Sequence, residues 1–458
     1  MASLALGARR GGAASAELRW LDGRLVSWFR LVGGKHHGAL GPVEGGTIVT
    51  AVEMAHDLGI PLVGVLDSSG ADVHEGVASL HAWGLVARQL ASASGMVPTV
   101  LVVVGASISG PALLLGVADL VVMTEDSFAY VTGPASVTAF TGIDITHEDL
   151  GGARSVHRTQ TGVAALFVDD EDAAMDAVAD VLSYLPANNL EEPPAEVCDD
   201  PVERATERAA SLVPVSATVS YDVREVIADV VDEHTLLELR AGYAPALVTA
   251  LARVDGRPVG VVANQPRHMA GTLDIDASQK GARFVQWCDA FNLPLLTFVD
   301  TPGFLPGKDL EWQGMIRHGA QLAHAYAAAT VPRVCVILRK AYGGAFIVMD
   351  CKTMGNDYCV AWPQAEVAVM GAPGAVAILR RRELAAAGED PATRARVQAE
   401  LEDDYRARYC TPEVAAERGY VDDVIDPLDT RRVVATALAA LRSKREELPD
   451  RRHANTPL

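Results

Sequence analysis

The chain has 458 residues, and its 59 acidic and 39 basic side chains give a formal net charge of −20 at pH 7. This balance argues against a surface that binds nucleic-acid phosphates or anionic lipid. Apolar residues (49%) and charged residues (21%) occur in the proportions of a globular protein, and the length predicts two or three domains.

Cysteine spacing and uncharged stretches exclude further classes of protein. The six cysteines form no Cys-x-x-Cys pair, so we expect free thiols and a cytoplasmic location rather than a disulfide framework or a zinc ribbon. No apolar stretch follows Arg9-Arg10, and we expect no targeting signal. Residues Val97–Ala118 carry no charge, but glycine, serine and proline interrupt them. We therefore expect a strand, a turn and a buried helix there, not a membrane span.

The first half of the chain predicts alternating helices and strands. A helix over Thr47–Leu58 precedes a strand over Leu62–Leu66, which ends at Asp67. A second helix over Gly76–Ala93 leads to a buried strand over Thr99–Val104, which runs into a glycine-rich turn. Runs of Val, Ile and Leu without alternation are typical of strands covered on both faces, so an α/β layer fold is expected.

A second copy of this plan follows at a spacing of roughly 235 residues. The segment Ile60–Gly70 matches Leu293–Gly303, and Ser109-Gly110 falls on Gly343-Gly344. The elements expected in the second copy are helices over Ser278–Phe291 and Trp312–Ala328 and strands over Leu295–Val299 and Arg333–Leu338.

The repeat predicts two domains, residues 1–190 and residues 221–458. The stretch between them is rich in proline and acidic residues, and we expect a linker over residues 191–220. Beyond Leu384 the chain is charged and helical. Helices over Thr393–Arg408 and Arg431–Glu447 are expected to form a surface appendage.

The two glycine-rich turns are the first candidates for chemistry. The segment Arg339-Lys-Ala-Tyr-Gly-Gly-Ala345 ends a strand and opens a helix, so its backbone N–H groups can bind an oxyanion or a phosphate. Such turns also let a helix cross a sheet without any function, and this alternative stays open. Lys340 could meet a phosphate or extend to solvent. The loop Asp300-Thr-Pro-Gly-Phe-Leu-Pro-Gly307 is either a structural turn or a wall for a flat ligand.

Other catalytic signatures do not occur in the sequence. It has no Walker-type or dinucleotide-binding glycine motif, and Gly105–Gly110 lacks the spacing of a nucleophile elbow. The histidines, including His36-His37, are scattered, so no metal site is expected. Asp67 and Asp300 end equivalent strands, where a cap for the following turn is expected in preference to the alternative, a catalytic acid.

Several motifs together resemble the carboxyltransferase (β) subunits of biotin-dependent acyl-CoA carboxylases, of the acetyl- and propionyl-CoA carboxylase type. The resemblance runs from about Leu40 to Leu458. Its strongest elements are Glu75–Leu80, Ala263–Pro266 and Asp300–Gly307. Four further segments add to it in order along the chain: Arg339–Ala345, Ala361–Pro363, Ala365–Gly371 and Ala415–Tyr420.

The resemblance implies an α/β fold of two tandem crotonase-like (ββα-spiral) domains with a C-terminal helical appendage. It implies a homo-hexamer, a trimer of dimers, whose active site lies between the first half of one subunit and the second half of its partner. Carboxybiotin, delivered by the biotin carboxylase and biotin carboxyl carrier subunits, meets an acyl-CoA there. Biotin is the one cofactor implied, and no metal, nucleic acid or membrane is expected to take part.

In that family the released biotin takes the α-proton of the acyl-CoA, and the thioester enolate then attacks CO₂. Two backbone oxyanion holes stabilise the charges, and by position they fall at Gly344-Ala345 and at Ser109-Gly110. Ile347 sits where the family shapes its acyl pocket, which implies a short or medium acyl chain. The other substrate-binding residues implied are Tyr342, Gly343, Phe346, Gly303, Phe304, Gly70 and Ala71.

The first half departs from the family's pattern. Its turn reads Ile108-Ser-Gly-Pro111 where Ala-Gly-Gly-Ala is usual; Pro111 has no N–H, and Ser109 needs an ordinary negative φ or strain. Asp72 replaces an arginine and Thr47 a lysine, in the half expected to hold the CoA thioester. Two alternatives therefore stay open: an acyl-CoA decarboxylase on the same fold, and a divergent subunit that assembles with an active paralogue.

Overall fold

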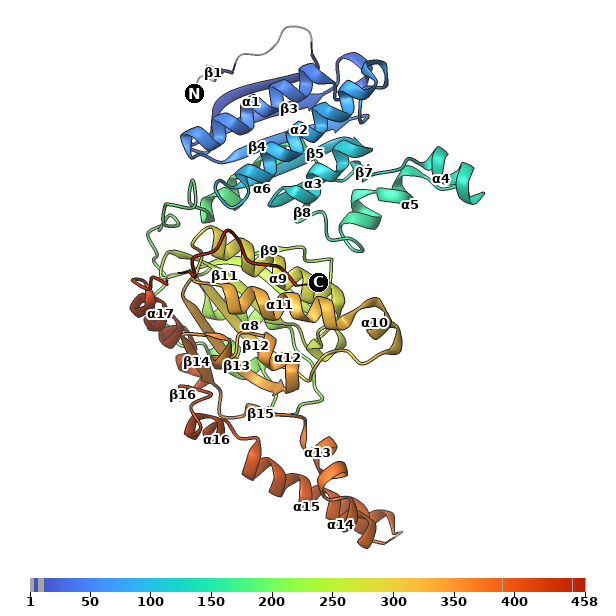
Figure 1. Ribbon diagram of the computed structural model, residues 1–458. Coiled ribbons are helices and arrows are strands. Elements are labelled where there is room, and N and C mark those ends of the chain that lie inside the picture. Colours follow the sequence, from blue (N-terminus) through green and yellow to red (C-terminus); the bar gives the residue numbers. More distant parts are fainter. Residues whose placement is uncertain (1–3, 7–11, 389, 447, 458) are drawn as a thin grey trace. The chain divides into compact units, whose positions relative to one another are not determined.

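The computed structural model describes residues 4–6, 12–388, 390–446 and 448–457. The chain divides into two compact units (Figure 1). Arg9-Arg10 and residue 447, the end of an expected helix, lie outside the described residues. The first unit is Met1–Pro194 with Leu239–Ala244 and Ala290–Asn292, and the second is Ala195–Glu238 with Pro245–Asp289 and Leu293–Leu458.

The first unit is built on a sheet of order β1-β2-β3-β4-β5-β6-β8, with β7 paired to β5. Its strands are β1 (Leu4–Ala5), β2 (Ala14–Leu21), β3 (Arg24–Val32), β4 (Leu62–Ser68), β5 (Thr99–Ile108), β6 (Leu120–Thr124), β7 (Phe128–Tyr130) and β8 (Leu166–Val168). Its helices are α1 (Pro42–Leu58), α2 (Val77–Ala93), α3 (Leu114–Val117), α4 (Pro134–Thr141), α5 (His147–Gly151) and α6 (Glu171–Tyr184). Helices α1 and α2 run side by side across one face of the sheet, and apolar residues of both helices and of the strands form the core (Figure 1).

The second unit repeats this sheet in the order β16-β14-β13-β12-β11-β10-β9, with β15 paired to β13. Its strands are β9 (Leu237–Leu239), β10 (Leu247–Val254), β11 (Arg257–Asn264), β12 (Leu295–Thr301), β13 (Arg333–Tyr342), β14 (Tyr358–Ala361), β15 (Glu366–Ala368) and β16 (Asp423–Val424). Its helices are α7 (Glu207–Leu212), α8 (Val223–Val230), α9 (Ile275–Ala290), α10 (Lys308–Gln313), α11 (Met315–Ala328), α12 (Gly343–Val348), α13 (Ala372–Leu379), α14 (Arg381–Ala386), α15 (Pro391–Tyr409), α16 (Pro412–Glu417) and α17 (Thr430–Leu441). Every residue of β10 and β13 is buried. For β13, which contains the strand expected over Arg333–Leu338, this agrees with the prediction of a strand covered on both faces.

Each unit contains an antiparallel hairpin that the internal repeat did not indicate. Asp22-Gly23 joins β2 to β3, and Asp255-Gly256 joins β10 to β11, with all four residues at positive φ. Asp-Gly at a two-residue turn is the strongest local signal for a hairpin, because both positions tolerate the left-handed backbone. The signal was therefore present in the sequence at both places.

Both units also share an irregularity where the central strands end. Leu66 and Ser68 of β4 pair with Val103 and Ser107 of β5, so β5 holds two extra residues between the same two pairing points. The same shift separates β12 from β13, where Val299 pairs with Ile337 and Thr301 with Ala341. Each bulge lies directly before one of the two glycine-rich turns.

The remaining expected elements differ in detail from the structure. The helix expected over Trp312–Ala328 is broken at Gly314, whose φ of +96° separates α10 from α11. Residues Val97–Ala118 form β5, a 3-10 helix (Gly110–Leu113) and α3, as expected. Within the described ranges, no helix combines the length and the apolar character needed to cross a bilayer.

The stretch expected to be a linker, residues 191–220, contributes to the second unit from Ala195 onward. Thr206 and Ala209 are fully buried there, and the buried Arg431 of α17 donates a hydrogen bond to the carbonyl of Pro201 at 3.0 Å. Helix α15, which covers the expected Thr393–Arg408, projects from the sheet together with α13 and α14 (Figure 1). The second helix expected in the appendage, over Arg431–Glu447, corresponds to α17, and this expectation is wrong: α17 packs into the core of the second unit, where Arg431 and Val434 are fully buried. The domain boundaries expected from the sequence, with domains over residues 1–190 and 221–458, stay a prediction.

Candidate functional site

The second glycine-rich turn, Tyr342-Gly343-Gly344-Ala345, joins β13 to α12. Gly343 has a φ of +61°, a conformation that glycine adopts without strain. The amides of Gly343, Gly344 and Ala345 open α12, so the preceding turn of the helix supplies no acceptor for them. Gly344 is exposed and Ala345 is fully buried. The turn can therefore donate consecutive N–H groups to an oxyanion.

The structure brings Gly303 and Phe304 to this turn. A Cβ added at Gly344 would lie 3.5 Å from Cε2 of Phe304, so the aromatic ring is in ordinary contact range of the glycine. Gly303 has a φ of +144°, and its carbonyl accepts a hydrogen bond from the Leu273 amide at 3.2 Å. The loop therefore places an aromatic side chain beside the amides.

The side chains around the second turn differ in exposure. The Tyr342 hydroxyl donates to the Glu366 carboxylate, and burial together with that carboxylate raises the pKa of Tyr342 above its ordinary value. Phe346 is buried, whereas Ile347 is 40% exposed. Ile347 therefore presents an apolar side chain from α12 beside the turn.

A buried ionic cluster fixes the strand that leads into the second turn. One carboxylate oxygen of Asp300 accepts from Nε of Arg339 at 3.0 Å, and the other accepts from the backbone amide of Lys340 at 3.2 Å. The Tyr221 hydroxyl donates to the same carboxylate at 2.9 Å. Asp300 thus holds the bulge of the neighbouring strand instead of capping its own turn. Burial, partly opposed by the nearby Asp300, lowers the pKa of Lys340, whose Nζ lies 3.5 Å from the Asp300 carboxylate.

The first glycine-rich turn has the same shape with different donors. Ser109 has a φ of +65°, so the strain expected as one of two outcomes is present. Its amide already donates to the carbonyl of Tyr130 at 2.9 Å. Pro111 has no N–H, and this leaves the amide of Gly110 as the donor that the turn can offer. Trp83 packs on Gly110 so closely that an added Cβ would lie 2.7 Å from its indole ring.

Gly70 and Ala71 lie beside this turn. Gly70 has a φ of +103°, and an added Cβ would lie 2.9 Å from the carbonyl oxygen of Ile108. Ala71 forms an isolated parallel bridge with Leu40. The carboxylate of Asp67 accepts from the Ala106 amide at 2.8 Å, which repeats the Asp300 arrangement in the first unit. The structure thus groups the predicted residues of each unit around that unit's own turn.

Two residues near the turns were missed in the sequence, Trp83 and Tyr221. The indole nitrogen of Trp83 is buried and, among the described residues, has no hydrogen-bond partner. Tyr221 lies outside the repeated segments, so the repeat gave no signal for it. Thr47, which replaces an expected lysine, is buried and donates to the carbonyl of Val43 at 3.0 Å.

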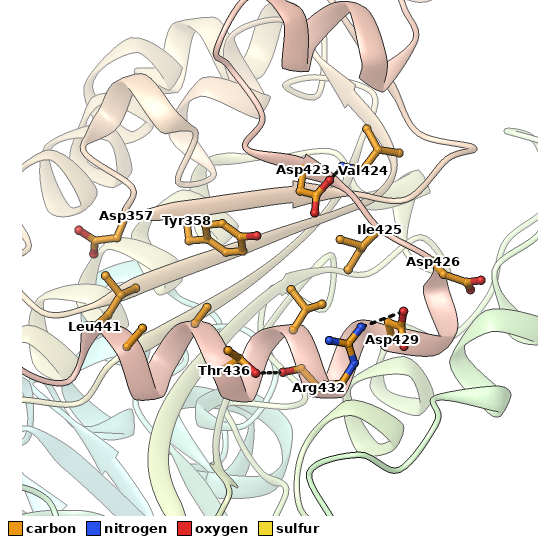
Figure 2. A pocket seen from close by; sticks show the side chains of 13 residues that line it. Asp357, Tyr358, Asp423, Val424, Ile425, Asp426, Asp429, Arg432, Thr436 and Leu441 are labelled. Atoms are coloured by element: carbon orange, nitrogen blue, oxygen red, sulfur yellow. Dashed lines mark hydrogen bonds and ion pairs between the residues drawn. The ribbon is translucent and has the colours of Figure 1, made fainter.

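A groove of about 570 Å³ lies elsewhere in the second unit, between α17 and the strands β14 and β16 (Figure 2). Its walls carry Asp357, Asp423, Asp426 and Asp429, and Arg432 pairs with Asp429 at 3.0 Å. None of the predicted site residues lines it. An acidic wall disfavours anionic ligands, so this groove is not assigned to an anionic substrate.

Several known proteins are similar to this chain in both sequence and fold. The carboxyl transferase domain family matches residues 20–456. The propionyl-CoA carboxylase beta chain of Saccharopolyspora erythraea is 47% identical over 447 residues, which cover 96% of this chain and 82% of that protein. The methylmalonyl-CoA decarboxylase subunit alpha of Veillonella parvula is 41% identical over 440 residues, which cover 96% of this chain and 84% of that protein. A crystal structure of transcarboxylase 12S, described as a hexamer assembly with methylmalonyl-coenzyme A and methylmalonic acid bound, matches with a TM-score of 0.93 and 39% identity over 100% of this chain and 90% of that one.

Proposed function

This chain belongs to the carboxyl transferase family, and on that premise we propose that it is the carboxyltransferase component of a biotin-dependent acyl-CoA carboxylase. It moves the carboxyl group of carboxybiotin, held on a carrier protein, to the α-carbon of a short or medium acyl-CoA. Biotin carboxylase and biotin carrier functions belong to partner subunits. The observation that carries the proposal is the turn from Tyr342 to Ala345, whose helix-opening amides suit an oxyanion.

The residues of the second turn fit the flat, polar ureido group of biotin. When carboxybiotin is bound there, it supplies the carboxyl group. The amides of Gly344 and Ala345 would donate to the ureido oxygen, and the ring of Phe304 would form an apolar wall beside them. Gly343 gives the backbone the positive φ that this presentation needs. Tyr342, neutral and bonded to Glu366, fixes the end of β13.

The first turn serves the acyl-CoA. Once the bond between its ureido nitrogen and the carboxyl group has broken to give CO₂, biotin would accept the α-proton of the acyl-CoA at that nitrogen. The electron pair of the C–H bond moves toward the thioester oxygen, and the amide of Gly110 stabilises the negative charge there. The α-carbon of the enolate then forms the new bond to CO₂. Gly70 and Ala71 line the approach to this turn, and Ile347 favours an alkyl chain over a charged one. Ile347→Asp should therefore shift the preference among acyl chains.

The complete site needs a first turn and a second turn from two copies of the chain, in a homo-hexamer built as a trimer of dimers. Support comes from the related transcarboxylase 12S, whose crystal structure is described as a hexamer assembly.

One observation favours a second candidate, a divergent subunit that relies on an active paralogue. The first turn has lost the amide of Pro111 and uses that of Ser109 internally, so fewer donors remain for an enolate. Pro111→Ala restores the missing N–H. A large gain in activity from this variant would support the second candidate, and no gain would support a turn that works through Gly110 alone.

The decisive experiment incubates the purified chain with propionyl-, malonyl- and methylmalonyl-CoA, with and without a biotinylated carrier and its biotin carboxylase. Transfer of labelled bicarbonate that requires both partners supports the carboxyltransferase. Release of CO₂ by the chain without them would overturn it in favour of a decarboxylase. An assembled but inactive protein would point to the divergent subunit.

A further inference from the structure

Three side chains that the proposed reaction does not use meet in the first unit: His36, Asp72 and His74. One ligand atom from each lies within 4.8 Å of the others. The Nδ1 atom of His36 is 2.9 Å from a carboxylate oxygen of Asp72. The two imidazole rings stack, with their centroids 4.3 Å apart. Two imidazoles and a carboxylate therefore share one small volume, partly open to solvent.

The backbone around this cluster is held in place by hydrogen bonds between two loops, one after β3 and one after β4. Their distances run from 2.7 to 3.0 Å, and the donor–acceptor pairs are the Leu40 amide with Gly70 O, the Asp72 amide with Leu40 O, the Ser69 amide with His37 O and the Ser69 hydroxyl with His36 O. The second carboxylate oxygen of Asp72 accepts the amide of His74 at 3.0 Å. The chain positions of all three residues are thus fixed relative to one another, and the side chains alone would need to adjust.

We propose that His36, Asp72 and His74 bind a divalent transition-metal ion of the Zn²⁺ type, with solvent completing the coordination. Two nitrogen ligands and one oxygen ligand match the donors that zinc takes in sites with an open position. Imidazole ligands disfavour Mg²⁺ and Ca²⁺, which prefer oxygen atoms.

The geometry requires a small closure. Ligand atoms around a tetrahedral zinc ion at bonds of ~2.1 Å lie ~3.4 Å apart. The separations in the cluster reach at most 4.8 Å, and His74 is exposed, so rotation of its side chain can close them. The ion would tie the loop after β3 to the turn after β4.

The ion also has a consequence that rests on the proposed function. It reverses the sign of the charge that Asp72 brings to the unit proposed to hold the CoA thioester. A polyanionic CoA ester would then meet a positive charge near Gly70 and Ala71. Removal of the metal should raise KM for the acyl-CoA more than it lowers kcat.

The test measures metal binding without any CoA ester, so it stands apart from the proposed function. Full-length protein is stripped with a chelator and titrated with Zn²⁺ by calorimetry and with Co²⁺ by visible absorption. We expect one ion per chain, and at least a tenfold weaker affinity in His36→Ala, Asp72→Ala and His74→Ala. His81→Ala, an exposed histidine on α2, is the matched control and should bind as the unmodified chain does.

Circular dichroism establishes that each variant is folded. Because His74 is exposed, His74→Ala is the substitution expected to affect folding least. The proposal is overturned if the stripped protein binds neither ion, or if His74→Ala binds both as tightly as the His81→Ala control. Tight binding with normal kinetics toward acyl-CoA would keep the metal site and remove its link to CoA.

Discussion

The turn that ends β5 and the turn that ends β13 share a backbone and differ in side chains. Ser109 and Gly343 have φ values of +65° and +61°, but glycine alone takes this conformation without strain. The second turn opens its helix with the amides of Gly344 and Ala345, whereas the first places Pro111 at the position that matches Ala345. The same path of the chain therefore presents two different sets of donors.

The groups beneath the turns differ in the same direction. Asp300 is fully buried and pairs with Arg339 and Lys340, while Asp67 is half-buried and faces Gly105 where the second unit has Arg339. Both carboxylates accept the amide of a bulge residue. The comparison teaches that the carboxylate–amide contact preserves the shape of the turn, while the charges and donors around it are free to change.

The largest expected difference between the two units is in the free energy of unfolding when the carboxylate beneath each turn is removed. Asp300→Asn leaves two buried cations without their counter-charge and should lower the free energy of unfolding by about 3–5 kcal/mol. Asp67→Asn, the matched variant, weakens one hydrogen bond and should lower it by about 1 kcal/mol. Urea denaturation of both proteins measures the difference. Equal losses would show that the ionic cluster adds nothing to the second unit.

The next effect concerns the donors of the second turn. Gly344→Pro removes one N–H in the first turn of α12, where proline is sterically tolerated, and should lower kcat about 10²–10³-fold. Gly344→Ala keeps the N–H and adds a methyl group at ordinary contact distance from Phe304, so its loss should be much smaller. Steady-state carboxylation assays compare the two. A similar loss in both would assign the effect to shape and not to the donor.

A reciprocal exchange tests the strain in the two turns. Ser109→Gly should raise the free energy of unfolding by about 1 kcal/mol, because relief of backbone strain exceeds the added entropy of glycine in the unfolded chain. Gly343→Ser should lower it by about 1–3 kcal/mol, since it creates the same strain and places a Cβ 3.1 Å from the carbonyl of Val369. Thermal denaturation measures both. Changes of the same sign would contradict the shared backbone.

The smallest effect is a pH dependence of the first unit. His157 donates from Nε2 to the carbonyl of Ala129 on β7, the strand whose Tyr130 carbonyl accepts the Ser109 amide. Burial, partly opposed by this hydrogen bond, lowers the pKa of His157 below its ordinary value. The folded state therefore binds fewer protons than the unfolded state just below that value. Stability should be complete above about pH 6.5 and decrease as the pH falls, by less than about 1.4 kcal/mol per pH unit.

His157→Gln, which cannot titrate, should flatten this part of the stability curve. The exposed His81→Gln variant is the control and should keep the slope of the unmodified protein. Denaturation series between pH 5 and pH 7.5 give the comparison, and an unchanged slope in His157→Gln would assign the acid sensitivity to other groups.

The sequence predicted the parts of the fold that depend on local pattern. Apolar runs marked the buried strands β4, β5, β12 and β13, and the internal repeat placed Ser109-Gly110 opposite Gly343-Gly344. The two hairpins were not predicted, although Asp22-Gly23 and Asp255-Gly256 are typical hairpin turns. The reason is that the repeat was recognised from the parallel strands alone.

The candidate sites were less accessible to sequence reasoning. Asp67 and Asp300 were expected to cap their own turns, but a bulge in the neighbouring strand brings a different amide to each carboxylate. Register shifts of this kind depend on pairing between strands and leave no local pattern. The same holds for His36 and His74, which are far apart in the sequence and meet because two loops are bonded to each other.

The two Asp-Gly hairpins also have a kinetic consequence. Their strands are neighbours in sequence, so their contacts can form within ~1–10 μs, whereas the parallel pairs that follow must wait for long crossovers to close. Each unit thus contains one hairpin that can form early and onto which its parallel strands can then add. During synthesis the β2–β3 hairpin leaves the ribosome hundreds of residues before β16, the last strand of the chain. Most of the first unit can therefore fold while the second is still being made.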